Sequence, residues 1–307
     1  MNIGIIGARR TSNGIGEFIA KYFHAAGAQV NAVLGTTEQS SRVAADNLKK
    51  YGIMAHPYID FSRMMNEEDL DAVVIASPTP THEYYIEQCI EAGAHVFCEK
   101  PFVSPDTASP ARLLRRIFTR ARRKRITIAM NSQWGFCLHA YEELCGTLGK
   151  GSAKTFQMRL SPICTGRAMI PDSVPHALSI LYTALGDGML QDVRIEGTRE
   201  SMQVSFAYKW VHGTCKASVS LVTEQTQPRT LSFGFDGQDV HRAIDMDTYT
   251  ISFLHEGNSL VLTDPLDLSV RDFMEAIEDH RPPTIGEAHI ISTSKMLKDI
   301  YDACTIR

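Results

Sequence analysis

The chain has 307 residues, which is long for one hydrophobic core and ample for two, because single cores stop growing at roughly 250–300 residues. Its formal net charge of −4 creates no broad field that would gather nucleic acid or an anionic membrane surface. No segment approaches the roughly 20 apolar residues that span a bilayer, and the N-terminus has no signal-peptide pattern. The sequence therefore predicts a cytoplasmic protein of two domains that binds neither nucleic acid nor a membrane.

Seven cysteines are scattered along the chain, and no two have the C-x-x-C spacing. Their odd number argues against a disulfide framework, and their spacing argues against a structural zinc site. We expect reduced thiols and no bound metal.

Residues 1–130 alternate short apolar runs with amphipathic stretches, a pattern typical of strand–helix–strand units in a parallel sheet. The expected strands lie at residues 3–6, 30–34, 72–76, 95–98 and 126–130. The expected helices lie at residues 16–26, 40–51, 81–92 and 108–123. Each helix is long enough to cross over and return to the sheet. Residues 1–130 are thus predicted to form a doubly wound α/β domain of the Rossmann type.

Residues 131–307 are predicted to form a second, α/β domain with a large, mainly antiparallel open sheet. A helical segment near 175–185 precedes a series of alternating runs without intervening helices, which is typical of antiparallel strands. The runs lie at residues 193–197, 203–210, 216–222, 230–235, 248–254 and 259–263. Two closing helices are expected at 269–279 and 285–303. In the first domain, the arginine-rich block at 115–125 is interpreted as a solvated helix face, with anion binding as the alternative.

A glycine-rich turn follows the first expected strand and opens the first helix. Glycine suits this position because the turn must be tight, the pyrophosphate of a dinucleotide must approach bare backbone, and the helix N-terminus offers free N–H groups. Six residues separate Gly7 from Gly14, so the spacing differs from G-x-G-x-x-G, and a plain glycine-rich turn is the alternative. The location favours a dinucleotide site, whose predicted residues are Gly7, Arg9, Arg10, Gly14, Ile15 and Gly16.

The end of the second expected strand bears on the choice between NAD and NADP. An NAD site usually has an acid there that holds the ribose 2′-hydroxyl, whereas this chain has Thr36 and Thr37, and its first acid is Glu38. Hydroxyls with a nearby arginine suit a 2′-phosphate. NADP is therefore predicted over NAD, and arginines that merely face water are the alternative. The neighbouring arginines are Arg9, Arg10 and Arg42.

Two strings after the fourth and fifth expected strands carry a family resemblance. Ala76-Ser77-Pro78-Thr79-Pro80-Thr81-His82 is followed by Ala92-Gly93-Ala94-His95-Val96-Phe97-Cys98-Glu99-Lys100-Pro101. Together they resemble the A-[TS]-P-x-x-x-H … A-G-x-H-V-x-x-E-K-P signature of the Gfo/Idh/MocA oxidoreductases. The resemblance covers residues 1–130 apart from the phosphate loop, and the remainder more loosely. It implies an NAD(P)-dependent oxidoreductase whose cofactor side includes Ser77, Pro78, His82, Glu99, Lys100 and Pro101.

The resemblance also implies the catalytic residues. The lysine of E-K-P, here Lys100, is catalytic or orients the substrate, and an ammonium beside a nicotinamide polarises a carbonyl. The family's D-x-x-x-H element matches Asp172 and His176, which lie on one face if the segment is helical. His176 is the expected general acid/base, since imidazole ordinarily titrates near pH 6.5, and Asp172 would bind a substrate hydroxyl or orient the ring. A helix cap and a core histidine are the alternative reading of this pair.

The segment before Asp172 departs from the pattern of relatives that act on sugars and inositols. Those relatives usually have two or three glycines there, whereas this chain reads Thr165-Gly166-Arg167-Ala168-Met169-Ile170-Pro171. Arg167 is a candidate for pairing with a substrate carboxylate, and Trp134 is a candidate for stacking on a substrate ring. Packing roles are the alternative for both residues.

These observations predict hydride transfer between NADP or NAD and a small polar carbonyl or alcohol substrate. An imine or tetrapyrrole reductase of the same fold is one alternative, and a non-catalytic dinucleotide-binding sensor is another. The resemblance further implies that residues 131–307 bind the substrate and assemble the chain into a homodimer or homotetramer.

Overall fold

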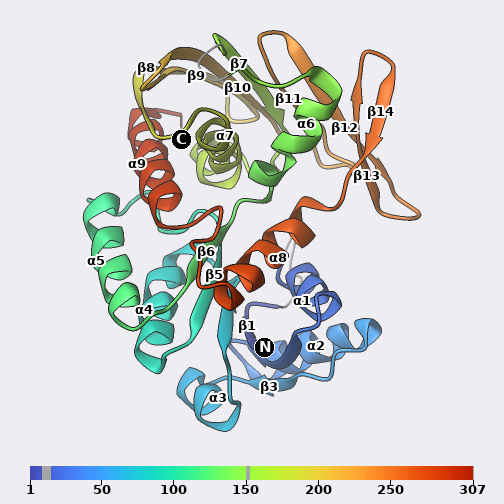
Figure 1. Cartoon of the computed structure of the whole chain (residues 1–307), viewed down its shortest axis with the longest axis vertical. Helices are drawn as coiled ribbons and strands as arrows, with labels where there is room; N and C mark the ends of the chain where they lie inside the picture. The colour runs from blue at the N-terminus through green and yellow to red at the C-terminus, as the bar shows by residue number, and fades with distance from the viewer. Residues whose placement is uncertain (9–14, 150–152, 307) are drawn as a thin grey trace. The chain divides into compact units, whose positions relative to one another are not determined.

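The computed structural model describes residues 1–8, 15–149 and 153–306, which divide into two compact units (Figure 1). The first unit contains Met1–Ser104, Arg112–Asn131 and Leu266–Glu287. The second unit contains Pro105–Ala111, Ser132–Pro265 and Ala288–Arg307. The sequence prediction of a boundary after residue 130 did not include the return of residues 266–287 to the first unit.

The first unit is built on a six-stranded parallel sheet of order β3-β2-β1-β4-β5-β6. All four residues of β4 are buried, as expected for a parallel strand with both faces covered. The predicted doubly wound Rossmann fold is therefore confirmed. The strands are β1 (Asn2–Ile6), β2 (Gln29–Leu34), β3 (His56–Tyr58), β4 (Ala72–Ile75), β5 (His95–Glu99) and β6 (Ile128–Asn131).

Helices cover both faces of this sheet. One face carries α1 (Gly16–Ala25), α2 (Glu38–Leu48) and α8 (Pro265–Glu278), and the other carries α4 (His82–Ala92) and α5 (Pro110–Arg123) (Figure 1). Phe273 of α8 lies with its ring centroid 6.1 Å from Phe23 of α1 and 5.3 Å from Phe97 of β5. The core of the Rossmann unit thus includes a helix from near the end of the chain.

Two short elements of the first unit were not predicted. Strand β3 has only three residues, includes Pro57 and lies at the sheet edge, which is where a strand proline is tolerated. Helix α3 (Phe61–Glu67) has two turns and begins where the Asp60 carboxylate accepts the N–H of Arg63 at 2.6 Å. Both are too short to show a hydrophobic period.

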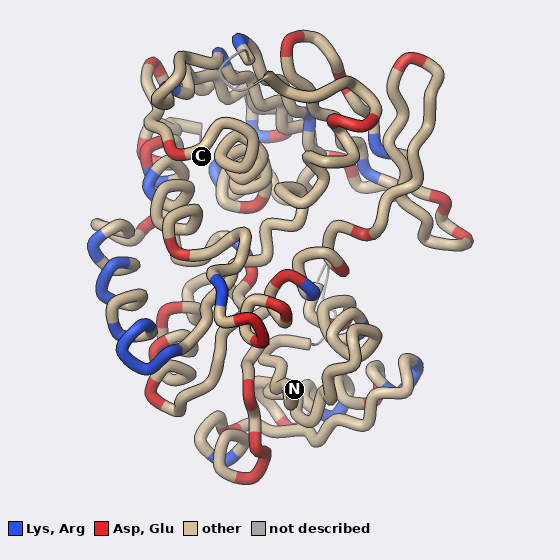
Figure 2. The backbone as a smooth tube through the Cα atoms, in the orientation of Figure 1, with Lys and Arg blue, Asp and Glu red and all other residues tan. Residues whose placement is uncertain are grey.

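The arginine-rich block lies on α5 and just after it, beside an acidic face of α4 (Figure 2). Arg116 lies 2.8 Å from Glu87, Lys124 lies 3.0 Å from Glu91, and Arg120 also pairs with Glu91. Such exposed ion pairs contribute little stability each. Their number fits the interpretation of this block as a solvated helix face.

The second unit is built on an eight-stranded sheet of order β14-β13-β12-β11-β7-β10-β9-β8. Among the strands that the structure describes, only β7 and β10 pair in parallel, so the expected mainly antiparallel sheet is confirmed. Strands β7 and β12 were not predicted. The strands are β7 (Thr155–Leu160), β8 (Gly188–Gly197), β9 (Ser201–Trp210), β10 (Gly213–Val222), β11 (Leu231–Phe235), β12 (Gln238–Asp245), β13 (Thr250–His255) and β14 (Asn258–Val261).

One face of this sheet is covered by α6 (Leu138–Cys145), α7 (Met169–Leu185) and α9 (Glu287–Ala303), which form a single apolar core with the strands (Figure 1). Helix α7 begins six residues before the expected start at Pro175. The expected start rested on proline, which favours the first turn of a helix. In α7, however, Pro175 lies inside the helix and is buried. Within the part of the chain that the structure describes, no helix is both long and apolar enough to cross a membrane.

A buried histidine joins two helices of the second unit. His289 of α9 is 3% exposed, its Nε2 lies 2.9 Å from the Ser179 hydroxyl on α7, and its ring lies 4.4 Å from that of Tyr182. Burial lowers the pKa of His289 to about 3, because the charged ring loses its hydration. The folded protein therefore holds this imidazole neutral at every physiological pH.

We expect His289 to make the protein sensitive to acid. Below about pH 6.5 the unfolded chain binds a proton at this position and the folded chain does not. The free energy of unfolding therefore keeps its full contribution from His289 above that pH and loses it as the pH falls toward 3. The loss approaches about 1.4 kcal/mol per pH unit. His289→Gln keeps a polar group for Ser179 and removes the titration, so its free energy of unfolding should fall less between pH 7 and pH 4. Denaturant titrations of both proteins measure this difference, and parallel losses would contradict it.

Candidate functional site

Gly7, just after β1, and Gly16, the first residue of α1, lie so close to neighbouring backbone that only glycine fits at either position. Gly7 has a φ of +86°, and a Cβ there would lie 2.7 Å from the carbonyl oxygen of Ala76. A Cβ at Gly16 would lie 2.7 Å from the carbonyl oxygen of Gly7. The N-cap of α1 is Ile15, whose aliphatic side chain has no group to cap the first N–H groups. Bare backbone and an uncapped helix start are what a pyrophosphate requires, so these residues fit a dinucleotide.

Three residues predicted for this loop lie outside the described residues. They are Arg9, Arg10 and Gly14.

The end of β2 leads directly into the N-terminus of α2. Thr36 and Thr37 are exposed, and the Thr37 hydroxyl accepts the N–H of Ser40 at 3.1 Å as the N-cap of the helix. The first acid, Glu38, lies 3.3 Å from Arg42 in an exposed ion pair. Hydroxyl groups and the positive end of a helix dipole therefore occupy the position where an NAD site usually has a carboxylate.

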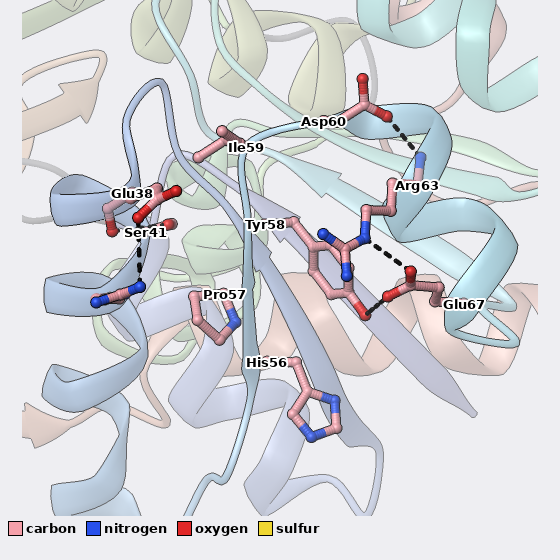
Figure 3. Close-up of a pocket in the computed structure, with 10 residues that line it drawn as sticks. Glu38, Ser41, His56, Pro57, Tyr58, Ile59, Asp60, Arg63 and Glu67 are labelled. Carbon is pink, nitrogen blue, oxygen red and sulfur yellow. Dashed lines mark hydrogen bonds and ion pairs between the residues drawn. The ribbon is translucent and has the colours of Figure 1, made fainter.

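A polar pocket of about 500 Å³ lies beside α2, between that helix and α3 (Figure 3). Both of its arginines are engaged by carboxylates, since Arg42 pairs with Glu38 and Arg63 lies 2.7 Å from Glu67. Burial and the neighbouring glutamates raise the pKa of Tyr58, whose hydroxyl therefore stays a donor. The lining contains three carboxylates and two arginines, so the pocket carries no excess of positive charge. Its lining residues are Glu38, Ser41, Arg42, His56, Pro57, Tyr58, Ile59, Asp60, Arg63 and Glu67.

This pocket was not anticipated from the sequence. Half of its lining lies on or next to β3, the strand that escaped prediction, and no motif marks these residues.

His82 ties together the loops that follow β4 and β5. Its side chain is 1% exposed, and its Nε2 and Nδ1 lie 2.8 and 3.1 Å from the carbonyl oxygens of Ser77 and Pro101. Burial lowers the pKa of His82, which favours the neutral ring. A neutral ring carries one N–H, so His82 donates to one of these two carbonyl oxygens and contacts the other, while the Ser77 and Thr81 hydroxyl groups hydrogen-bond at 2.7 Å.

The carboxyl end of β5 carries Glu99 and Lys100, followed by buried Pro101 across a cis peptide bond. Glu99 lies opposite Asn131 of β6 in the sheet register and accepts a hydrogen bond from its amide nitrogen. The amide oxygen of Asn131 is buried with no hydrogen-bond partner among the described residues. Asn131 is thus a candidate site residue that the sequence analysis did not select.

The register of the first sheet gathers the predicted residues of this unit at one edge. Ile6 and Ile75 end β1 and β4 and are in register with each other and with Cys98, the residue before the last one of β5. The residues that follow them therefore meet at the carboxyl edge, where open α/β sheets bind their ligands. Those residues include Gly7, Ser77, Pro78, Glu99 and Lys100.

The second unit positions Asp172 and His176 on α7. Asp172 is exposed in the first turn, where the helix dipole favours an acidic side chain. Its carboxylate accepts a hydrogen bond from the Ser173 hydroxyl at 3.0 Å. His176 lies one turn later on the same face and is partly buried. The predicted pair is therefore adjacent on a helix, as the spacing suggested.

The two residues proposed for substrate contacts have partners inside the second unit. Arg167 donates from Nε and Nη2 to the carbonyl oxygen of Tyr301 at 3.2 and 2.8 Å, and its guanidinium lies 3.7 Å from the centre of the Tyr301 ring. Trp134 is 4% exposed, with the guanidinium of Arg242 5.5 Å from its ring centre. Arg167 thus fastens the segment before α7 to α9, which is the packing alternative for this residue.

Comparisons with known proteins support a dinucleotide-binding fold in the first unit. A family model described as "Oxidoreductase family, NAD-binding Rossmann fold" matches residues 1–131. Inositol 2-dehydrogenase from Azotobacter vinelandii is 36% identical over 104 residues, which are 33% of this chain and 28% of that protein. The chain thus matches less than a third of that relative's length.

Solved structures resemble the whole chain. UDP-N-acetylglucosamine 3-dehydrogenase from Acidithiobacillus ferrooxidans is 18% identical with a TM-score of 0.73, covering 99% of this chain and 97% of that one. An oxidoreductase from Agrobacterium radiobacter in complex with NAD+, L-tartaric acid and magnesium is 14% identical with a TM-score of 0.71, covering 99% and 96%. At these identities the likeness concerns the fold.

We expect Gly16→Ala to weaken dinucleotide binding by at least about tenfold. The added methyl group meets the backbone of Gly7, which has little freedom to move, and overpacking of this kind costs roughly 1–3 kcal/mol. Gly213→Ala is the matched control, because Gly213, like Gly16, lacks a positive φ, and a Cβ there would meet only ordinary contacts of 3.5 Å or more. NADPH fluorescence titrations of both variants test this at a temperature where both are folded. Equal affinities in the two variants would contradict the role of Gly16.

Proposed function

We propose that this chain, whose residues 1–131 match the model of an NAD-binding oxidoreductase family, is a Gfo/Idh/MocA oxidoreductase that transfers hydride between NAD(P) and a small polar carbonyl or alcohol substrate. The observation that carries the proposal is the glycine-only turn at Gly7 and Gly16, at the sheet edge where Lys100 follows β5. That edge combines a surface for a pyrophosphate with an amine.

The first unit would hold the dinucleotide through backbone and hydroxyl groups. Gly7, Gly16 and the N-terminus of α1 are assigned to the pyrophosphate, and Ser77, Pro78, Glu99 and Lys100 to the cofactor side of the reacting centre. A bound nicotinamide supplies or accepts the hydride. His82 and Asn131 keep the strand ends in place, since their bonds run to Ser77, Pro101 and Glu99.

We further propose that the cofactor is NADP in preference to NAD. The segment after β2 presents Thr36 and Thr37 at the N-terminus of α2, and both hydroxyl groups and a helix start favour a phosphate. Glu38, the first acid, is engaged with Arg42. Arg9 and Arg10, which lie outside the described residues, are proposed from the sequence alone as neighbours of the 2′-phosphate.

Three side chains are assigned to the chemistry. In the reducing direction the carbonyl carbon gains a hydride and its oxygen gains a proton, so an electrophilic group and an acid are required. Lys100 is proposed to polarise the carbonyl, His176 to supply the proton, and Asp172 to orient the imidazole or a substrate hydroxyl. In the oxidising direction His176 accepts the proton from the alcohol.

The second unit is the proposed substrate-binding and assembly unit. Its helices lie on one face of the sheet, while the other face carries partly exposed polar residues such as Gln203 and Ser218. This second face is the proposed contact of a homodimer or homotetramer, and the cytoplasm is the proposed compartment.

We expect Lys100→Ala to lower kcat by roughly 10²- to 10⁴-fold, the usual contribution of a group that assists proton or charge transfer. The dissociation constant for NADPH should stay nearly unchanged, because the pyrophosphate is bound elsewhere. Steady-state kinetics with a substrate found in a panel of polar carbonyl and alcohol compounds measure the effect.

Lys124→Ala is the matched control for this variant. Lys124 follows α5 at the opposite, amino edge of the same sheet and pairs with Glu91, so its loss should leave kcat unchanged. A Lys100→Ala enzyme with normal kcat would remove this lysine from the mechanism. Binding of NADPH without turnover of any compound in the panel would favour a sensor.

The cofactor preference has its own measurement. We expect kcat/KM for NADPH to exceed that for NADH, because the threonines and the α2 N-terminus accept a 2′-phosphate that an acid would repel. Kinetics with both cofactors at one substrate concentration give the ratio. A clear preference for NADH would contradict the assignment and leave the hydride-transfer proposal in place.

A further inference from the structure

An arginine of β12 occupies an apolar position of the strand. Side chains alternate between the faces of a strand, so Arg242 lies on the same face as Val240, which is fully buried in the core of the second unit. Position 242 would ordinarily carry an aliphatic residue. An arginine there needs partners that satisfy its charge and its five N–H groups.

A second arginine lies next to Arg242. The Nη2 of Arg242 donates to the backbone carbonyl of Arg229, just before β11, and the Nη1 of Arg229 donates to the carbonyl of Ser161 at 3.3 Å. The two guanidinium groups thus bond to neutral carbonyl groups at the point where β7 ends and β11 begins. The ring of Trp134 forms a wall of this cluster, 5.5 Å from the guanidinium carbon of Arg242.

The cluster has an excess of positive charge. Both Nε atoms, of Arg229 and Arg242, are buried without a hydrogen-bond partner among the described residues. Burial and, after it, the charge of Arg229 lower the pKa of Arg242, against an opposing effect of Tyr249. Among the described residues no carboxylate acts on it. The carboxylate of Glu224 nearby instead accepts the Thr230 N–H at 2.8 Å and pairs with Arg159.

Two neighbouring guanidinium groups that are partly buried without a carboxylate partner reduce the stability of the fold. Removing a charge from water costs several kcal/mol unless an opposite charge and hydrogen bonds replace the hydration. Both arginines are partly exposed, so each side chain reaches the solvent although its Nε atom is buried. A carboxylate or a phosphate has the charge and the oxygen geometry that a guanidinium binds best.

We propose that Arg229 and Arg242, with Trp134 as a wall, form a subsite for an oxyanion, a carboxylate or phosphate group of the substrate. Trp134 belongs to η3 (Gln133–Cys137), which packs against α7, the helix of Asp172 and His176. The assignment of the oxyanion to a substrate rests on the proposed function. The substrate class is then a carbonyl or alcohol compound that bears an acidic group.

The two tryptophans of the chain give a direct reporter. Trp210 lies on β9 and is replaced by phenylalanine, so that Trp134 is the only tryptophan left in the full-length protein. Inorganic phosphate and malonate are titrated separately at constant ionic strength, without dinucleotide, while the emission of Trp134 is recorded. We expect saturable changes in the millimolar range. The probe that saturates at the lower concentration identifies the group as phosphate or carboxylate.

Two variants in this background assign the binding to the arginine cluster. Arg242→Met keeps the length of the side chain and removes its charge, and it should raise the midpoint of the titration at least about tenfold. Arg194→Met removes an exposed arginine of β8 and should leave the midpoint unchanged. Thermal melts establish that each variant is folded.

The proposal is overturned if neither anion gives a saturable change, or if folded Arg242→Met binds as the parent does. If Arg242→Met does not fold, the titration is repeated with Arg229→Met. A raised midpoint then supports the proposal, and a midpoint equal to that of the parent overturns it. The titrations need neither nicotinamide nor turnover. A failure here therefore leaves the results for Lys100 unaffected, and a failure of hydride transfer leaves the anion titration valid.

Discussion

A single carbon atom added to Gly7, just after β1, or to Gly16, the first residue of α1, would collide with neighbouring backbone. Both glycines therefore present bare backbone next to the start of the first helix. A pyrophosphate binds such a surface through N–H groups and the helix dipole, with no charged residue required. The remainder of the cofactor side depends on this position, because the neighbouring strands are held in register with β1.

Buried polar residues, and not the loops themselves, hold the next two strand ends. His82 reaches the carbonyl groups of Ser77 and Pro101, and Asn131 reaches Glu99. Each of these contacts joins groups on different strands or loops of the same edge. Catalytic groups gain from such support, since a small displacement of a reacting group is costly in rate. Lys100 lies between Glu99 and Pro101, both of which are anchored in this way.

In the second unit, by contrast, two buried polar groups, the Nε atoms of Arg229 and Arg242, lack hydrogen-bond partners among the described residues, and such groups are costly to the fold. Arg242 takes an apolar position beside Arg229, and no acid among the described residues balances the two. A hydrocarbon side chain at position 242 would pack at no electrostatic cost. Local conflicts of this kind are expected at functional sites, where a ligand supplies the missing interaction. By contrast, Arg167 has its hydrogen bonds and its stacking partner within the unit.

Periodicity and local motifs in the sequence determined the doubly wound sheet, the mainly antiparallel second sheet, and the positions of Lys100, Asp172 and His176 on their elements. These features depend on residues close together in the chain. The tertiary structure alone decided that α8 returns to the first unit, that His82 bridges two loops, and that Arg242 lies against Trp134. A hydrophobic pattern reports which face of an element is buried, whereas the partner that buries it lies far away in sequence and is set by packing of the whole unit.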